Sequence, residues 1–204
     1  MKKDDKKNAH VPGRLARGSS DEDRYQYAKE AESAISPGRL SNEEKNRIDN
    51  LLGKYAEKTG RLDEAIDSYK KSRNEKRLIP LLEEFIQKGD LKHAEKAYQA
   101  LGPQADFNVD SLIRLAELYE KEKNPNGFIG EIDILEKVGQ KNPGKIVGKI
   151  NKLKTAYEKA GYRKAAHALG ELITTAEKAG PGKRDEYIIK NYNPRGYSHL
   201  DSKS

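Results

Sequence analysis

Apolar, small and glycine positions recur along the middle of the chain in two copies that match position by position. The copies occupy residues 52–69 and 81–98, so every matched pair is 29 residues apart. Each copy has a central glycine, Gly60 or Gly89. A repeat of this length is typical of stacked helical hairpins, and the sequence therefore predicts an array of paired helices. The other matched pairs are Leu52 and Leu81, Gly53 and Leu82, Ala56 and Phe85, Leu62 and Leu91, Glu64 and His93, Ala65 and Ala94, Ile66 and Glu95, and Tyr69 and Tyr98.

Capping and turn residues predict where these helices begin and end. Ser41 followed by Glu44 forms a capping box, in which each side chain accepts a hydrogen bond from the backbone N–H of the other residue. The helix that follows is apolar on one side and ends at Gly60. In the second copy Pro80 would cost about 3 kcal/mol inside a helix, so we expect that helix to begin near residues 78–80 or to bend there. The apolar positions of the first hairpin are Ile48, Leu51, Leu52 and Tyr55, then Leu62, Ala65, Ile66 and Tyr69.

Two more hairpins follow in the pattern. The third has apolar positions over residues 112–119 and 128–138, separated by a break at residues 124–127. The fourth begins at Asn142-Pro143, a helix cap followed by proline at the first helical position. We expect its first helix to be continuous, with Ile146, Ile150, Leu153 and Tyr157 on one face, and to end at Gly161 before a return helix over residues 165–173.

The chain divides into four predicted parts. Residues 1–20 form a disordered basic arm, residues 21–40 a helix capped by Ser20 and its turn, residues 41–180 the repeat domain, and residues 181–204 a short capping helix at 183–190 with a polar tail. The predicted fold is all-α: a right-handed α-solenoid of about four helix-turn-helix hairpins, with an extra N-terminal helix and flexible ends. Only 34% of residues are apolar, which suits a stack in which each hairpin buries a single stripe.

Residues 154–166, Lys-Thr-Ala-Tyr-Glu-Lys-Ala-Gly-Tyr-Arg-Lys-Ala-Ala, and residues 60–66 share a glycine followed five positions later by alanine. In this pattern the region over roughly residues 44–179 resembles tetratricopeptide repeat (TPR) proteins, although their period is about 34 residues. The resemblance implies a concave face, built from the first helix of each hairpin, that receives a peptide or a partner. The family's carboxylate clamp of Lys and Asn is not evident, because Leu51 and Lys54 stand at the matching places of the first hairpin.

Positive charge is concentrated in two segments of a chain whose net charge is +7. Residues 1–18 hold six Lys or Arg and two Asp, and residues 137–164 hold nine Lys or Arg and a single carboxylate. Within the second segment, four lysines are spaced four, four and three apart and are predicted to lie on one side of one helix: Lys141, Lys145, Lys149 and Lys152. Such a stripe is mildly destabilising to a helix. Three interpretations remain open: a solvated face, a surface for an acidic protein, and a phosphate-binding surface.

The tyrosines fall into two groups. Those on the repeat stripes are predicted to be core residues: Tyr55, Tyr69, Tyr98, Tyr119 and Tyr157. In the C-terminal tail, Tyr187, Tyr192 and Tyr197 alternate with basic residues. These aromatic rings either dock the tail onto the last hairpin, which we favour, or stack on single-stranded bases.

Catalytic chemistry finds little support. There is no cysteine, and the four histidines, His10, His93, His167 and His199, lie in separate regions. The chain has no glycine-rich phosphate loop, no paired-histidine metal motif and no nucleophile elbow. We therefore expect no enzyme activity, no cofactor and no metal. No apolar run approaches the roughly 20 residues needed to cross a bilayer, and the N-terminus lacks a secretory pattern, so we expect a cytoplasmic protein.

The function predicted from these patterns is a non-catalytic protein-protein interaction scaffold or adaptor that binds a peptide or partner helix, with an acidic partner among the candidates. The alternative is a sequence-tolerant RNA-associated protein that uses the basic fourth hairpin and the tails. A third interpretation is a subunit of a larger assembly, but polar segments at both ends of the array favour a monomer. The candidate partner-binding residues are Asn50, Lys54, Arg114, Glu117, Lys145, Lys149 and Lys152.

Overall fold

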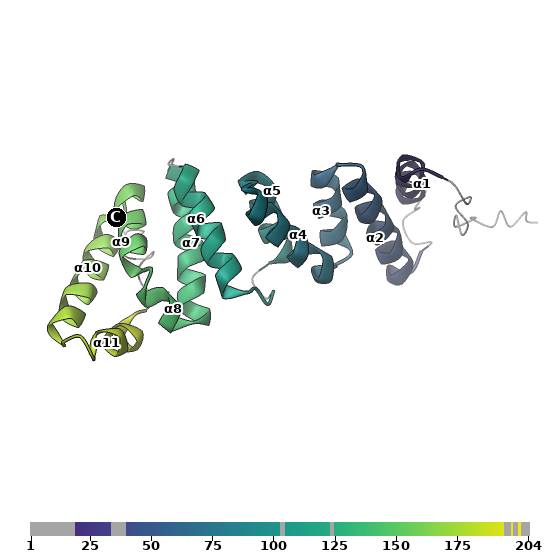
Figure 1. Ribbon diagram of the computed structural model, residues 1–204. Coiled ribbons are helices and arrows are strands. Elements are labelled where there is room, and N and C mark those ends of the chain that lie inside the picture. Colours follow the sequence, from purple (N-terminus) through teal and green to yellow (C-terminus); the bar gives the residue numbers. More distant parts are fainter. Residues whose placement is uncertain are drawn as a thin grey trace, which may run out of the picture. The chain divides into compact units, whose positions relative to one another are not determined.

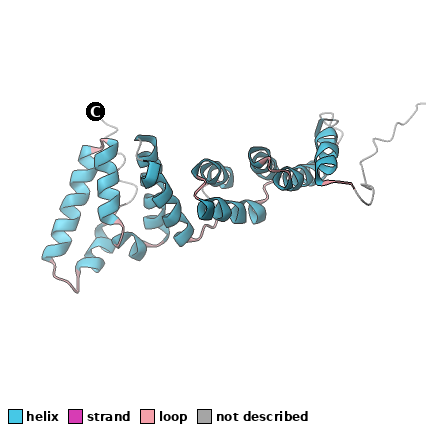
Figure 2. Ribbon diagram, turned by 45° about the horizontal axis from the view of Figure 1, so that its top comes forward, coloured by secondary structure: helices cyan, strands magenta, loops and turns pink. Residues whose placement is uncertain are grey.

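The computed structural model describes residues 19–33, 40–102, 105–122, 125–193, 197 and 200. Within these residues 81% of the chain is helical and no strand is present (Figures 1 and 2). The helices pack mostly on their neighbours in sequence, as in a helical array. The predicted all-α class is thereby confirmed. The helices of the described part are α1 Asp21–Ser33, α2 Asn42–Lys58, α3 Leu62–Lys71, α4 Glu75–Lys88, α5 Leu91–Leu101, α6 Val109–Glu122, α7 Pro125–Lys141, α8 Pro143–Val147, α9 Ile150–Ala160, α10 Arg163–Lys178 and α11 Arg184–Asn191.

Contacts within the chain divide it into two units. The first unit comprises Met1–Glu84 and Lys92–Ala105, and the second comprises Phe85–Leu91 and Asp106–Ser204. The predicted basic arm, apart from residues 19 and 20, lies outside the described residues, and so do residues 34–39 of the predicted N-terminal helix and turn.

In the first unit, α1 packs on α2 and α2 packs on α3. The predicted capping box is present, because the Ser41 side chain accepts from the Glu44 N–H and the Glu44 side chain accepts from the Ser41 N–H. Gly60 has φ +76°, a left-handed conformation that glycine adopts without steric cost. The helices approach closely at Gly53, where an added Cβ would lie 2.8 Å from the Tyr69 ring.

The fourth helix begins earlier than the sequence predicted. Asn74 stands just before α4, and its Oδ1 accepts a hydrogen bond from the Arg77 N–H at 3.2 Å. This cap satisfies a backbone donor of the first turn and starts the helix at Glu75, so Pro80 lies inside α4. Of the two expected outcomes, a start near residues 78–80 was therefore wrong, and a bend at Pro80 stays a prediction.

In the second unit, α6 packs on α7, α7 packs on α9, and α9 packs on α10. Gly130 of α7 lies against Tyr119 of α6 so closely that an added Cβ would overlap the ring. Gly161 has φ +85° and ends α9 as predicted. The Asn142 side chain accepts from the Lys145 N–H with Pro143 at the start of the helix, which confirms that cap.

Two predictions about these hairpins were wrong. The expected break at residues 124–127 is shorter, because α7 already begins at Pro125, a residue that is preorganised for the first helical position. The expected continuous helix of the fourth hairpin is interrupted at Gly148 and Lys149, between α8 and α9. Glycine is a poor helix former, and it stands where α8 ends.

The predicted helix at residues 183–190 is α11, and two tyrosines of the described residues beyond it are buried. Tyr192 and Tyr197 are both buried, and their stacked rings lie 5.7 Å apart between centroids. A Cβ added at Gly139 of α7 would lie 2.6 Å from the Tyr192 ring, so the tail packs against α7. The two tyrosines are buried, as the docking interpretation expected, but Tyr192 contacts α7 of the third hairpin, whereas the last hairpin was expected.

Candidate partner-binding groove

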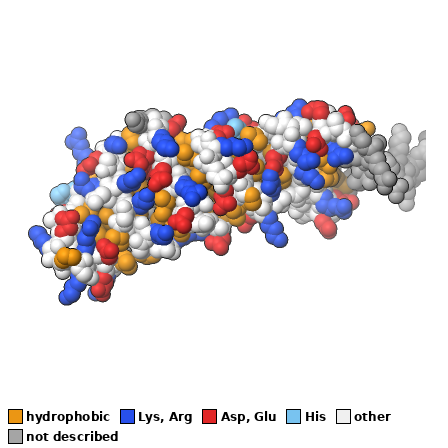
Figure 3. Space-filling view, viewed as in Figure 1, with side chains coloured by type: hydrophobic (Ala, Val, Ile, Leu, Met, Phe, Trp, Pro, Cys, Tyr) orange, Lys and Arg blue, Asp and Glu red, His pale blue; other side chains and the backbone are white. Residues whose placement is uncertain are grey.

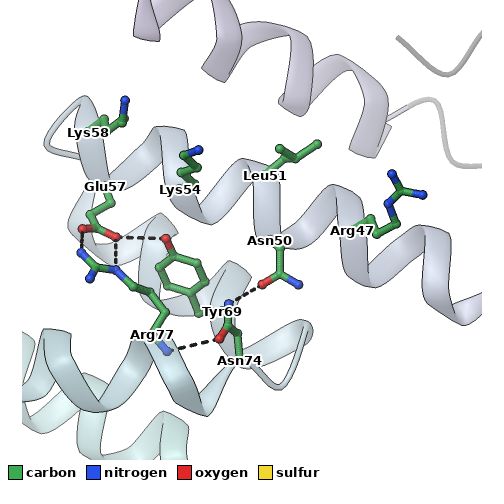
Figure 4. A pocket seen from close by; sticks show the side chains of 9 residues that line it. All are labelled: Arg47, Asn50, Leu51, Lys54, Glu57, Lys58, Tyr69, Asn74 and Arg77. Carbon is green, nitrogen blue, oxygen red and sulfur yellow. Dashed lines mark hydrogen bonds and ion pairs between the residues drawn. The ribbon is translucent and has the colours of Figure 1, made fainter. Parts of the chain in front are cut away.

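An open groove of about 630 Å³ lies in the first unit, along α2 and beside α3 and the first turn of α4 (Figure 4). Two of the residues predicted from the sequence, Asn50 and Lys54, line it. All of its lining residues come from α2, α3, the turn after α3 and the first turn of α4: Arg47, Asn50, Leu51, Lys54, Glu57, Lys58, Tyr69, Asn74 and Arg77.

The floor of the groove is a hydrogen-bonded network around Glu57. Its carboxylate accepts from the Tyr69 hydroxyl at 3.0 Å and from Arg77 Nε at 2.9 Å, and Arg77 Nη2 makes a second contact with it. The paired Glu57 raises the pKa of Arg77, and burial raises the pKa of the Tyr69 hydroxyl. Arg77 therefore stays charged and Tyr69 stays neutral at physiological pH.

Asn50 joins α2 to the turn before α4. Its Oδ1 accepts from Asn74 Nδ2 at 2.7 Å (Figure 4). The same atom accepts from Ser72 Oγ at 3.1 Å, and Asn50 Nδ2 donates to the Asn46 carbonyl at 2.8 Å. Most of its hydrogen-bonding capacity is thus used within the protein. The structure places this predicted contact residue in the floor of the groove, where it positions its neighbours.

The rim of the groove is a single face of α2. Arg47, Leu51, Lys54 and Lys58 follow one another at i, i+4, i+7 and i+11, and Figure 4 shows them on the same side of the helix. Leu51 is 47% exposed. Lys54 lies 5.7 Å from the centroid of the Tyr55 ring, and Lys58 pairs with Asp21 at 3.2 Å. The rim therefore combines one half-exposed apolar side chain with flanking cations.

Four of the five predicted residues in the second unit take part in ion pairs with one another or with carboxylates of α6. Lys145 Nζ lies 3.2 Å from Asp110, Lys149 Nζ lies 3.0 Å from Glu117, and Lys152 Nζ lies 2.9 Å from Glu120. Together with Lys141, which lies 3.4 Å from Asp106, these pairs form what we call the charge ladder. On the face shown in Figure 3, Lys or Arg and Asp or Glu side chains are interspersed.

The lysines of the ladder come from more than one helix, so their prediction as a stripe on a single helix was wrong. Lys141 ends α7, Lys145 lies in α8, Lys149 caps α9 and Lys152 lies within α9. A sequence signal for the pairing existed, because each lysine follows its carboxylate by 35 or 32 residues. The remaining candidate, Arg114, is an exposed residue of α6.

A second polar cavity, of about 190 Å³, lies between α6, α7 and α9. It is lined by Glu131, whose side chain is only 3% exposed and makes no hydrogen bond or ion pair within the described ranges. Burial, reinforced by the charge of Glu120, raises the pKa of the Glu131 carboxyl to about 7, against the opposing effect of Lys152 and Lys159. Sequence reasoning missed Glu131, although it lies four positions before Leu135 on the apolar face of its helix.

In the described part of the chain, no metal site or histidine cluster is formed. No group of three or more His, Cys, Asp or Glu residues there is placed to hold a metal ion. His93 lies 3.9 Å from Asp63 in the first unit, and His167 lies 3.5 Å from Glu171 in the second. None of the described helices has the length and apolarity needed to span a membrane.

Comparison with known proteins does not assign the chain to a family. No family model, curated protein or solved structure matches it.

Proposed function

We propose that this protein is a non-catalytic interaction scaffold or adaptor that binds a peptide or partner helix in the groove of α2, α3 and α4. The observation that carries the proposal is the groove itself: an exposed Leu51 between cations, above a floor whose side chains are already hydrogen-bonded to one another. A prearranged floor lowers the ordering cost of binding.

The finer architecture is part of the same proposal: a TPR-like, right-handed α-solenoid. Its support is local. Gly60 and Gly161 have left-handed backbones at the ends of α2 and α9, and Ala65 is fully buried at the position where the repeat pattern needs a small residue. For location and assembly, the corresponding proposal is that the protein is cytoplasmic and monomeric. This part of the proposal rests on the sequence alone.

The RNA-binding alternative has less support than the groove. Phosphates approaching Lys141, Lys145, Lys149 and Lys152 would have to displace the four carboxylates of the charge ladder. The gain from releasing counterions would be offset by the loss of those pairs.

Affinity capture from native lysate, with the groove as the variable, tests the proposal. The wild-type full chain is compared with the groove variant Leu51→Asp/Lys54→Glu. The control is Ile189→Asp, which adds a charge at an exposed apolar residue of α11, outside the groove. We expect a protein that is captured by the wild type and the control, is absent from the groove variant and survives nuclease. Capture that is equal for all three chains, or that is lost on nuclease treatment and at about 300 mM salt, would contradict the proposal.

A further inference from the structure

The chemistry of the occupant follows from a charge inventory of the groove, and this inference rests on the proposed function. Four cations line the groove, but Arg77 is paired with Glu57 and Lys58 with Asp21. Neither Arg47 nor Lys54 forms an ion pair in the described part of the chain, although the charge of Arg47 helps to lower the pKa of Glu44, one turn before it on α2. The groove therefore presents two cations outside any ion pair and is complementary to a negatively charged partner.

The spacing of these two charges sets the spacing of the partner's carboxylates. Arg47 and Lys54 are seven residues apart on α2, which corresponds to about 10 Å along the helix axis at about 1.5 Å per residue. Leu51 lies between them on the same face. In a helix that lies along α2, residues at i and i+7 have the same separation, with an apolar residue at i+3 or i+4 between them.

A helical occupant suits the groove better than an extended one. Asn50, Asn74, Tyr69 and Glu57 direct their polar atoms to one another and to Arg77. An extended peptide would find few free hydrogen-bonding groups there for its backbone, whereas a helix satisfies its own. We infer that the groove binds an acidic amphipathic helix, whose two carboxylates seven residues apart pair with Arg47 and Lys54 on either side of an apolar residue that packs on Leu51.

A display selection on the full-length protein tests the inference. The probe is a library of random peptides of about 18 residues, five turns of helix. We expect the selected peptides to carry Asp or Glu seven residues apart with a large apolar residue between them. Their Kd should rise by about tenfold or more on Arg47→Glu/Lys54→Glu, because each like-charge contact opposes binding. The matched control, Lys70→Glu/Lys190→Glu, changes the net charge equally outside the groove and should leave the Kd within about twofold of the wild type.

A charge exchange gives the second readout. Peptides whose two acidic residues are replaced by lysine should bind Arg47→Glu/Lys54→Glu and lose binding to the wild type. The selection could instead yield peptides whose binding is lost on Leu51→Asp but which lack the acidic pair. That result would overturn the inference of an acidic helix and leave the proposed function standing. An acidic pair three residues apart, the spacing of an extended chain at about 3.3 Å per residue, would overturn the helical form. A selection that yields no peptide dependent on Leu51 would overturn both the inference and the proposed function.

Discussion

Glu131 shows how a single buried carboxyl group couples this fold to pH. The carboxyl has its pKa raised from 4.5 to about 7 in the native protein. Between pH 4.5 and about 7 the Glu131 carboxyl is protonated in the folded chain and ionised in the unfolded chain. The contribution of this bound proton to the free energy of unfolding is therefore fully present below about pH 4.5 and is lost as the pH rises through about 7. Above that range, the buried charge costs about 3 kcal/mol in the free energy of unfolding.

Substitution of Glu131 by Gln should remove this pH dependence. We expect Glu131→Gln to be more stable than the wild type by up to about 3 kcal/mol near pH 8 and to differ little near pH 5, where the native carboxyl is protonated. Chemical denaturation at both pH values measures the difference. The control is Glu177→Gln, an exposed residue of α10. A stability gain of equal size at both pH values would contradict the account.

Two glycines of the second unit should respond in opposite ways to alanine. At Gly130 the added methyl group would overlap the Tyr119 ring, so we expect Gly130→Ala to lower the free energy of unfolding by about 1–3 kcal/mol. At Gly148 nothing lies within 4 Å of the added Cβ, and φ is −69°. Gly148→Ala should therefore be neutral or stabilising by up to about 1 kcal/mol. Equal effects of the two substitutions on thermal unfolding would show that α6 and α7 do not pack at Gly130.

At the scale of helices, the charge ladder links successive parts of the second unit through long side chains. Lys149 and Lys152 at the start of α9 reach Glu117 and Glu120 of α6. Each pair is largely solvent-accessible and contributes about 0–1 kcal/mol, less at high salt. The ladder therefore orients the helices and neutralises the basic segment more than it stabilises the fold.

Charge exchange tests whether the lysines serve the fold or a partner. We expect Lys149→Glu to lower stability by about 0.5–1 kcal/mol, because it places a second negative charge beside Glu117, and Glu117→Lys to restore it in the double variant. The matched measurement is partner capture by the triple variant Lys145→Glu/Lys149→Glu/Lys152→Glu. If the triple variant folds but captures less partner, these lysines belong to the binding surface. If it captures as much partner as the wild type, they do not.

The elements whose ends depend on local chemistry could be predicted from the sequence. Ser41 with Glu44, Asn142 with Pro143, and the glycines Gly60 and Gly161 act on backbone groups within one helical turn, so their spacing alone identifies them. The start of α4 was missed because the Asn74 cap lies six residues before Pro80, the residue from which the start was predicted.

At the scale of the whole molecule, the chain forms two units whose contacts are mostly internal, and the groove belongs entirely to the first. Prediction from sequence found Asn50 and Lys54 of this groove, because the first helices of the hairpins were expected to face a partner. It did not find Glu57, Tyr69 and Arg77, because their network brings together residues 12 and 20 positions apart. The carboxylates of the charge ladder also lie far from their lysines in the sequence, and only the regular separations of 35 and 32 residues indicate the pairing.

Site-specific photo-crosslinking tests the central claim most directly. Benzoylphenylalanine is placed at position 51 in the groove, at position 114 on α6 and at position 189 on α11, all in the full chain and in native lysate. The account predicts a nuclease-resistant protein adduct from position 51, absent from positions 114 and 189 and lost when Lys54→Glu is added. Adducts that form at position 114 or 189 but not at position 51 would contradict the assignment of partner binding to the groove.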